Sequence, residues 1–380
     1  MRRLTLEPRV DWRAKVEALG LVWHSVGSAA YWNEAACYSF RSREIREIEQ
    51  ATAELYRMFL AAGDYVVEQG LLGRFGIPEW AHPLVVEAWR AAPPALNYGR
   101  FDLGYDGEGP PKLFEFNCDT PTSLIEAAVV QWFWKEEVFP YLDQFNSLHE
   151  HLAAKWADIA PYLADRLVHF GCVPDRAGED SVTTAYMMDL ARGAGLEPVR
   201  IAMRDIGYAA RDGGARFFDL EAREIRTLYK LYPWEWLVSE TFGPHIAEND
   251  ARTTWIEPIW KMMWSNKAIL PILWDLFPRH PNLLWARSDG PVSASYVKKP
   301  ILAREGGNVS VVKDGATLVA TDGPYVGAAI WQDLFDLPDF AGNRPVIGSW
   351  IVDGEPAGMG IREDGLVTSN LARFAPHVID

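Results

Sequence analysis

The chain has 380 residues and a formal net charge of −15, a length that allows one large multi-lobed domain or two to three small ones. The acidic balance argues against a nucleic-acid partner and is compatible with a cationic substrate. No apolar run approaches the length of a membrane span, and the start at Met1 lacks an apolar signal region, so we expect a cytoplasmic protein with no membrane partner.

The first strongly periodic element covers residues 41–70. Apolar side chains recur there at intervals of three and four, which predicts an amphipathic helix with one buried face. The residues of that face are Ile45, Ile48, Ala51, Leu55, Phe59 and Ala62.

A pair of strands with alternating character is predicted within residues 98–117. Residues two apart on a strand share a face, so Arg100 and Asp102 lie together, as do Glu115 and Asn117. If the strands pair, these four side chains form one polar patch, whereas the core-facing residues are Phe101, Leu103, Phe114 and Phe116. Two carboxylates and an amide oxygen suit Mg²⁺, and an arginine suits a phosphate or carboxylate. The alternative is an amphipathic hairpin with a solvated charged face.

A helix over residues 123–138 should follow this hairpin. Ser123 is its expected N-cap and Glu126 the capping-box partner. Cys118, on the face opposite Asn117, is expected to be a buried structural thiol. Farther along, the pattern predicts a β-α-β unit and a surface hairpin, with strands at 167–172 and 197–201, a helix at 181–194 and the hairpin at 205–224, turning at Arg211-Asp-Gly-Gly.

Lysines mark the last third of the chain. A helix is expected over 266–277, capped by Ser265 or Asn266, which places Lys267 in the first turn, where a cation opposes the helix dipole unless an anion lies nearby. Residues 296–312 read as strand, glycine-bearing loop and strand. Alternation turns one of Lys298 and Lys299 inward, and Gly306 and Gly307 allow a close approach of backbone N–H groups to an anion.

Several common enzyme sites are excluded by inspection. The three cysteines form no C-x-x-C pair, so neither a disulfide framework nor a zinc site is expected. There is no Gly-Lys pair of a Walker P-loop, and there is no G-x-G-x-x-G, G-x-S-x-G or H-E-x-x-H motif. A bound nucleotide would therefore lie between sheets rather than on a P-loop.

Together these segments carry a family resemblance. The chain resembles the glutathionylspermidine synthase family of ATP-grasp ligases, particularly its short, synthetase-only acid–amine ligase members, and more distantly the eukaryotic-type glutathione synthetases. The matching motifs are Arg-Phe-Asp at 100–102, Phe-Glu-Phe-Asn at 114–117, Ser-Asn-Lys at 265–267, Lys-Pro-Ile-Leu-Ala-Arg-Glu-Gly-Gly-Asn at 299–308, Ile-Gly-Ser-Trp at 347–350 and Gly-Met-Gly-Ile-Arg at 358–362.

The resemblance implies an α+β fold of the ATP-grasp type, with ATP held between two antiparallel sheets. Because the metal-ligand hairpin precedes the lysines in sequence, a circularly permuted arrangement like that of eukaryotic glutathione synthetase is implied. The amidase domain of the bifunctional members is not expected here, so no hydrolase activity is expected. The expected parts are an N-terminal helical segment at 1–95, a metal-ligand hairpin and helix at 96–160, an inserted β-α-β subdomain at 161–255, and a lid with C-terminal core strands at 256–380.

The resemblance also implies roles in the use of ATP and Mg²⁺. Arg100 and Arg362 would contact the γ-phosphate or an acyl phosphate, and Asp102, Glu115 and Asn117 would hold Mg²⁺. The nucleotide-binding residues would be Lys267, Lys299, Glu305, Gly306, Gly307 and, against the adenine along strand 329–334, Gln332. Without the resemblance, Gln332 would be interpreted almost equally well as a polar residue of an edge strand.

Four residues are implied at the substrate site: Thr120, Ser123, Glu179 and Asp180. Acidic residues there suit an ammonium group, although they are also favoured at a helix start, as hydroxyls are at an N-cap. One departure concerns the family's Lys-Thr-Trp-Ala-Trp-Glu, which is Lys-Leu-Tyr-Pro-Trp-Glu at 230–235 here. Leu231 thus replaces a substrate-contacting threonine, which weakens the case for glutathione.

Three functions remain open from the sequence. The first is an ATP-dependent ligase that joins a small-molecule carboxylate to an amine through an acyl phosphate. The second is an ATP-grasp peptide-type ligase or phosphotransferase without a polyamine substrate. The third is a non-catalytic nucleotide-binding protein, against which the full set of metal ligands and lysines argues.

Overall fold

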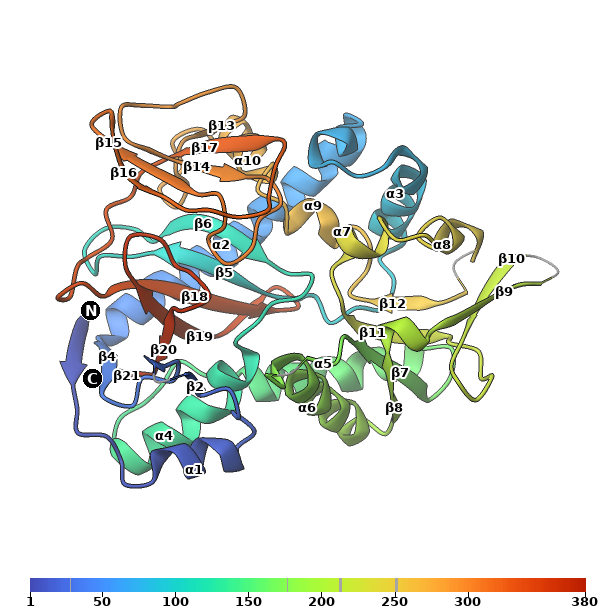
Figure 1. The fold of residues 1–380 in the computed structure, drawn as a ribbon, viewed down its shortest axis with the longest axis horizontal. Helices are drawn as coiled ribbons and strands as arrows, with labels where there is room; N and C mark the ends of the chain where they lie inside the picture. Colours follow the sequence, from blue (N-terminus) through green and yellow to red (C-terminus); the bar gives the residue numbers. More distant parts are fainter. Residues whose placement is uncertain (28, 176, 212–213, 250–251) are drawn as a thin grey trace.

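Two five-stranded antiparallel sheets form the centre of the computed structural model, which describes residues 1–27, 29–175, 177–211, 214–249 and 252–380 (Figure 1). The core sheet has the order β20-β19-β18-β5-β6, with β5 Tyr98–Gly104, β6 Lys112–Asn117, β18 Arg344–Val352, β19 Glu355–Asp364 and β20 Arg373–Ala375. The second sheet has the order β13-β17-β14-β15-β16, with β13 Ala286–Arg287, β14 Tyr296–Pro300, β15 Ser310–Lys313, β16 Ala316–Ala320 and β17 Ala329–Asp333.

The predicted hairpin is the β5–β6 pair, in which Arg100 lies opposite Asn117 and Asp102 opposite Glu115. The four-residue polar patch is thereby confirmed. The expectation that Phe114 faces the core was wrong. The register shifts after Asp102, so that Leu103 pairs with Leu113 and Phe114 is the extra residue of a β-bulge. Phe114 is therefore half-buried, and fully buried Leu113 takes the core position.

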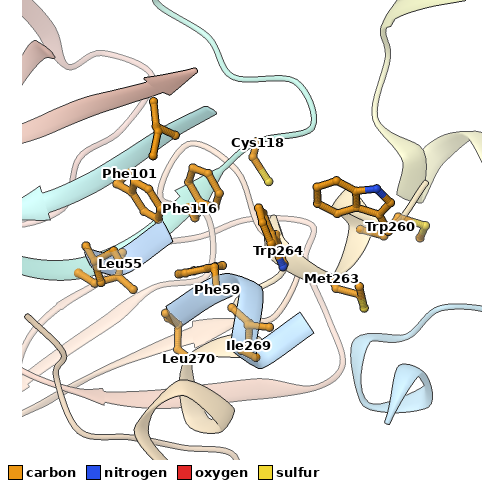
Figure 2. Close-up of a cluster of buried hydrophobic side chains, with 14 of the residues drawn as sticks. Leu55, Phe59, Phe101, Phe116, Cys118, Trp260, Met263, Trp264, Ile269 and Leu270 are labelled. Atoms are coloured by element: carbon orange, nitrogen blue, oxygen red, sulfur yellow. The ribbon is translucent and has the colours of Figure 1, made fainter. Parts of the chain in front are cut away.

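The apolar face of the hairpin packs on helix α2, Ser42–Glu68, the helix predicted at 41–70. All six predicted core residues of α2 are buried. In Figure 2 the rings of Phe59, Phe101 and Phe116 cluster with Trp264, and Phe101 stacks on Phe116 with 3.8 Å between ring centroids. Burial of aromatic rings on this scale fixes the hairpin, and its polar face consequently points away from α2.

A four-stranded parallel sheet forms the other lobe in Figure 1, in the order β12-β11-β7-β8. It contains the predicted β-α-β unit, and its elements are β7 Leu167–Cys172, α6 Glu179–Gly193, β8 Glu197–Ala202, β11 Thr227–Leu231 and β12 Thr254–Ile256. The predicted surface hairpin is β9 Gly207–Arg211 with β10 Gly214–Phe218. Asp212 and Gly213 of its turn lie outside the described residues.

The helix predicted at 123–138 begins at Leu124, directly after Ser123, but its predicted capping box was wrong, because tertiary contacts use both capping side chains. Ser123 has φ 65° and its hydroxyl contacts Tyr31, whereas Glu126 accepts hydrogen bonds from distant side chains. After α-helical residues 124–125 the helix continues as a π-helical turn, Glu126–Val130, and then as α4, Gln131–Val138. The helix start predicted at residue 266 was wrong. Ser265 accepts hydrogen bonds from the backbone N–H groups of residues 118–119, and α10, Ile269–Leu276, begins after Lys267.

The chain termini meet in a three-stranded sheet, in which β4, Ala36–Phe40, pairs with both β1, Arg2–Thr5, and β21, His377–Ile379 (Figure 1). Within the described ranges no helix has the length and apolar character needed to cross a membrane. The remaining elements are β1 Arg2–Thr5, α1 Trp12–Ala18, β2 Ser25–Val26, β3 Ala29–Ala30, β4 Ala36–Phe40, α3 His82–Ala91, α5 Leu148–Ile159, α7 Trp234–Leu237, α8 His245–Glu248, α9 Lys261–Trp264, α10 Ile269–Leu276 and β21 His377–Ile379, with short 3₁₀ turns at Leu72–Phe75, Glu79–Ala81, Ala160–Tyr162 and Met203–Asp205.

Candidate active site

Two cavities share a wall beside the polar face of the β5–β6 hairpin. The intersheet cavity, of about 360 Å³, is lined by both five-stranded sheets, and the adjoining cavity, of about 440 Å³, extends toward residues of the parallel-sheet lobe. Both volumes are in the range of small-molecule sites. The residues that line both cavities are Glu115, Lys267, Ala303, Glu305 and Arg362.

Arginines neutralise the first carboxylate of the polar patch. Arg100 donates to both oxygens of Asp102, from Nε at 2.7 Å and from Nη2 at 3.2 Å, and Arg362 donates to Oδ2 at 2.6 Å. Asn117 donates from Nδ2 to Asp102 and to Glu115, at 3.3 Å each. The patch and Arg362 therefore form one hydrogen-bonded unit.

Lysines neutralise the second carboxylate. Lys267 Nζ lies 2.9 Å from Glu115 Oε2 and donates to the Ala303 carbonyl at 3.0 Å. Burial opposes ionisation of Glu115, but Lys267 and Lys299 outweigh it and hold the pKa of this carboxyl below its ordinary value. Glu115 is thus a carboxylate across the neutral range, as a metal ligand must be.

Lys299 is the inward lysine that strand alternation predicted, whereas Lys298 is exposed. Its ammonium donates to Gln332 Oε1 at 2.7 Å and to the Phe114 carbonyl at 3.2 Å. Burial lowers the pKa of Lys299 to about 8. Gln332 in turn donates to the Leu113 carbonyl at 2.9 Å, so strand β17 is fixed to the core sheet across the intersheet cavity.

A loop with left-handed backbone conformations joins β14 to β15 beside both cavities. Glu305 has φ 56° and Gly306 φ 68°, and a Cβ at Gly306 would lie 2.7 Å from Val367 Cγ1. Residue 306 therefore has to be glycine, because the position combines a positive φ with no room for a Cβ atom. Glu305 lines both cavities and Gly306 the intersheet cavity, whereas Gly307 lines neither and packs against the Tyr325 ring.

Three of the four predicted substrate residues line the adjoining cavity, namely Thr120, Ser123 and Glu179; Asp180 does not. Glu179 begins helix α6 at the carboxyl end of β7. Burial, followed by the charges of nearby acidic residues, raises the pKa of Glu179 to about 8 and that of Asp180 to about 6. An unusually raised carboxyl pKa in a cavity is a common property of functional sites.

Sequence reasoning missed part of this wall. Arg304 donates to Glu235 at 2.6 Å and to the Thr120 hydroxyl at 3.4 Å, and its guanidinium lies over the ring of Trp236. All four line the adjoining cavity, as does Tyr31 from the N-terminal region. Arg304 lies within the 299–308 motif, which was the available signal, whereas nothing in the local pattern singles out Tyr31.

A buried ion pair holds two segments of this wall together. The Lys230 ammonium, fully buried on β11, pairs with Asp119, which also accepts from the Trp234 backbone N–H at 2.7 Å. Asp119 adjoins Thr120 in the chain, and Trp234 adjoins Glu235. The parallel sheet and the core sheet are therefore joined directly at the floor of the adjoining cavity.

The residues present fit Mg²⁺ by their donor chemistry. Two carboxylates and an amide on paired strand positions supply oxygen ligands, and Mg²⁺ typically binds one or two carboxylates together with substrate phosphates. In the part of the chain that the structure describes, no group of three or more His, Cys, Asp or Glu side chains is placed to hold a metal. A site here would thus depend on phosphate oxygens for its remaining ligands.

Comparison with known proteins places the chain among synthetases. The family model described as "Glutathionylspermidine synthase preATP-grasp" matches residues 3–380. A protein of Haemophilus influenzae named "Putative acid--amine ligase" is 38% identical, with 99% of each chain covered.

Two longer relatives match less closely. Trypanothione synthetase of Crithidia fasciculata is 29% identical over 84% of this chain and 52% of its own length. The bifunctional glutathionylspermidine synthetase/amidase of Escherichia coli is 28% identical over 90% of this chain and 59% of its own length. The chain thus spans only a little over half of these two proteins.

The fold is similar to that of a glutathione synthetase-like effector from Globodera pallida. The TM-score is 0.60 at 11% identity, and the match covers 98% of this chain and 96% of the other. This likeness supports the mixed α/β architecture with antiparallel sheets that the resemblance predicted.

Proposed function

The chain belongs to the glutathionylspermidine synthase family, and from this premise we propose that it is an ATP-dependent ligase that joins a carboxylate to an amine through an acyl phosphate. The observation that carries the proposal is the shared wall of the two cavities. Glu115, Lys267 and Arg362 line both, so a phosphoryl group held there is within reach of molecules in either cavity.

The intersheet cavity suits ATP. Lys299 and Lys267 supply the cations for its phosphates, the loop containing Glu305 and Gly306 borders them, and Gln332 on β17 is the proposed partner for the adenine edge. The hairpin comes first in the chain and the lysines later, yet both line one cavity. This order supports a circularly permuted ATP-grasp arrangement.

Asp102, Glu115 and Asn117 would hold Mg²⁺, which supplies charge neutralisation for the phosphates when bound. Arg100 and Arg362 would stabilise the charge that develops on the transferred group. To contact the ligand, Arg100 and Arg362 must exchange some of their hydrogen bonds with Asp102 for hydrogen bonds with the transferred group. Lys267 must likewise exchange its ion pair with Glu115 for a contact with the phosphate. The ion pairs in the structure thus keep these cations oriented until substrate arrives.

In the first step of the proposed reaction, a carboxylate oxygen attacks the γ-phosphorus of ATP, the acyl phosphate forms, and ADP leaves. The amine nitrogen attacks the acyl carbon, the C–N bond forms, and phosphate departs with the electrons of the broken C–O bond. Each amide formed requires the ammonium to lose two protons in all.

The identity of the acid is not carried over from the relatives. Leu231, which replaces the threonine expected to contact glutathione, is only 6% exposed and belongs to the hydrophobic core. It therefore provides no substitute contact. We propose that the acid is bound mainly through Arg304 and the hydroxyls of Thr120 and Ser123, which line the adjoining cavity.

The test is ADP release with Mg-ATP across a grid of acids, including glutathione, and amines, including spermidine, with mass spectrometry of the products. A ligase forms ADP only when both substrates are present, with a product equal to their sum minus water. Trapping by hydroxylamine separates an acyl phosphate from a stable phosphate ester, which a phosphotransferase would make. Absence of ATP binding would overturn the proposal.

A further inference from the structure

Glu305 lies at the apex of the loop that joins β14 to β15, and the chain on both sides of it is held in place. Arg304 pairs with the first turn of α7 across the adjoining cavity. The Gly306 carbonyl accepts from the Thr321 hydroxyl at 2.5 Å, and the Gly307 N–H donates to the Arg304 carbonyl at 3.0 Å. Glu305 itself has φ 56°, a left-handed conformation that is uncommon for residues other than glycine. Residues held in such conformations by their surroundings cluster at functional sites.

The carboxylate of Glu305 differs from most carboxylates around the two cavities in having no partner. Among the described residues it makes no hydrogen bond or ion pair, although it lines both cavities. Glu179 has no side-chain partner there either, but it lines the adjoining cavity alone. The cavity carboxylates with partners are Asp102 with Arg100 and Arg362, Glu115 with Lys267, Asp119 with Lys230, Glu235 with Arg304, Asp333 with Ser293 and Asp336 with Lys313.

The shared wall of the cavities is where the proposed reaction brings the amine to the acyl phosphate. The nitrogen that attacks there carries an extra proton once the C–N bond has formed, and a group beside it has to accept that proton. Glu115, the other acid on this wall, is paired with Lys267 and is the proposed metal ligand. Among the described residues Glu305 is therefore the carboxylate of the shared wall that is free to act as a base.

We propose, on the basis of the ligase function above, that Glu305 is the general base that accepts a proton from the attacking nitrogen. The ammonium loses its first proton to solvent before the attack. The nitrogen then bonds to the acyl carbon, the Glu305 carboxylate takes the second proton, and the C–O bond breaks with its electrons on the departing phosphate. Because Glu305 is exposed, the proton passes from it to solvent. A base of this kind typically accelerates a reaction about 10²–10⁴-fold.

This role differs from the nucleotide binding that the family resemblance implies for the same residue. A carboxylate repels phosphate oxygens, so direct contacts of this loop with ATP suit its backbone N–H groups rather than the Glu305 side chain. A metal ion between the two is the remaining way for Glu305 to serve the nucleotide. A base acts only on amide formation, whereas a nucleotide or metal ligand acts already on formation of the acyl phosphate.

Rapid-quench single-turnover measurements separate these two steps. The enzyme is in excess over Mg-ATP, with the acid–amine pair of highest turnover in the substrate grid, beginning with glutathione and spermidine. ADP reports the first step, and mass spectrometry of the amide reports the second. Glu305→Gln, which keeps the side-chain length and removes the charge, should form ADP at a rate close to that of the wild type. Its amide formation should be about 100-fold slower or more, so that acyl phosphate accumulates and is trapped by hydroxylamine.

Asp322→Asn is the matched control, because Asp322 is an exposed acid beside Thr321 that lines neither cavity. It should behave as the wild type. Glu305→Asp, which keeps a carboxylate one methylene shorter, should slow amide formation less than Glu305→Gln does.

An unchanged rate of amide formation in Glu305→Gln overturns the inference and leaves the ligase proposal standing. Slower ADP formation in this variant, or a changed dependence of ADP formation on Mg²⁺, assigns Glu305 to the nucleotide or the metal and also overturns the inference. If the wild type forms no ADP with any pair of the grid, the ligase proposal itself is refuted, together with the base that rests on it.

Discussion

The ammonium of Lys267 lies 2.9 Å from the carboxylate of Glu115, where the two cavities share their wall. The pair joins a strand of the core sheet to the segment before α10, which are far apart in the chain. In the proposed reaction this contact would change partners during turnover: Glu115 would bind the metal, and Lys267 the phosphate. The ion pair is therefore better understood as a resting arrangement of the site than as a contribution to stability.

Replacement of Glu115 tests this interpretation. Glu115→Gln should lower Mg²⁺-dependent ADP release about 100-fold or more, because a ligand and its charge are lost where the phosphates need neutralising. The free energy of unfolding should change by no more than about 1 kcal/mol, since Lys267 retains its bond to the Ala303 carbonyl. The control is Glu108→Gln, an exposed change in the loop of the same hairpin. Wild-type activity of Glu115→Gln would refute the metal assignment.

Neighbouring lysines allow a matched test of nucleotide binding. Lys299→Ala should weaken Mg-ATP binding roughly ten- to a hundredfold, as expected for loss of a charged hydrogen bond in a cavity. Lys298→Ala removes a lysine from the adjacent, exposed position and should leave affinity unchanged. Calorimetric titration of each variant with Mg-ATP gives the comparison, and equal affinities would remove Lys299 from the nucleotide site.

Much of this site was predictable because strand alternation is a local property. It correctly placed Arg100 with Asp102 and required one of Lys298 and Lys299 to point inward, which in the structure is Lys299. It failed at Phe114, because a bulge depends on the partner strand and leaves no mark in the alternation itself. The capping box expected at Ser123 failed for a related reason: Tyr31, more than ninety residues away, contacts the Ser123 hydroxyl and donates to the carboxylate of Glu126.

Two residues that sequence reasoning missed differ in the signal they leave. Arg304 lies within the 299–308 motif, whereas no local pattern singles out Tyr31, and the tertiary fold brings the two to Thr120 and Ser123. The roles that the family resemblance gave to the residues of the intersheet cavity stay predictions until ligands are measured.

Gly348 on β18 limits the space around Arg100. A Cβ at this glycine would lie 2.5 Å from Arg100 Cδ and 3.2 Å from its Nε. Gly348→Ala should therefore displace Arg100 from Asp102, cost about 1–3 kcal/mol of stability and reduce turnover more than Mg-ATP affinity. Urea denaturation and ADP release measure the two effects.

Gly73→Ala is the control for that substitution, because a Cβ there has no atom within 4 Å. If Gly348→Ala retained full turnover, exact placement of Arg100 would be unnecessary for the reaction.

Removal of one partner of the buried Lys230–Asp119 ion pair should destabilise the protein strongly, because the other charge is then left buried without its counter-ion. Lys230→Met leaves the Asp119 carboxylate buried with the Trp234 N–H as its one hydrogen-bond donor among the described residues, and we expect a loss of about 3–5 kcal/mol in the free energy of unfolding. Lys313→Ala, which breaks an exposed pair with Asp336, should cost at most about 1 kcal/mol. Urea denaturation of both variants decides the comparison; similar midpoints would show that the buried pair contributes little.

The raised pKa of Glu179 should make the free energy of unfolding of the ligand-free protein depend on pH, in a direction that can be derived. Its pKa is raised from 4.5 when folded to about 8, so between these values the native state binds more protons than the unfolded chain. The free energy of unfolding contributed by this group therefore falls as the pH rises through that window and levels off above it. Glu179→Gln should flatten the decline between about pH 5 and pH 8, whereas Asp189→Asn should not. Parallel urea titrations across this range measure the slope. A slope that is the same in Glu179→Gln and wild type would show that the pKa of Glu179 in the folded protein is close to its ordinary value.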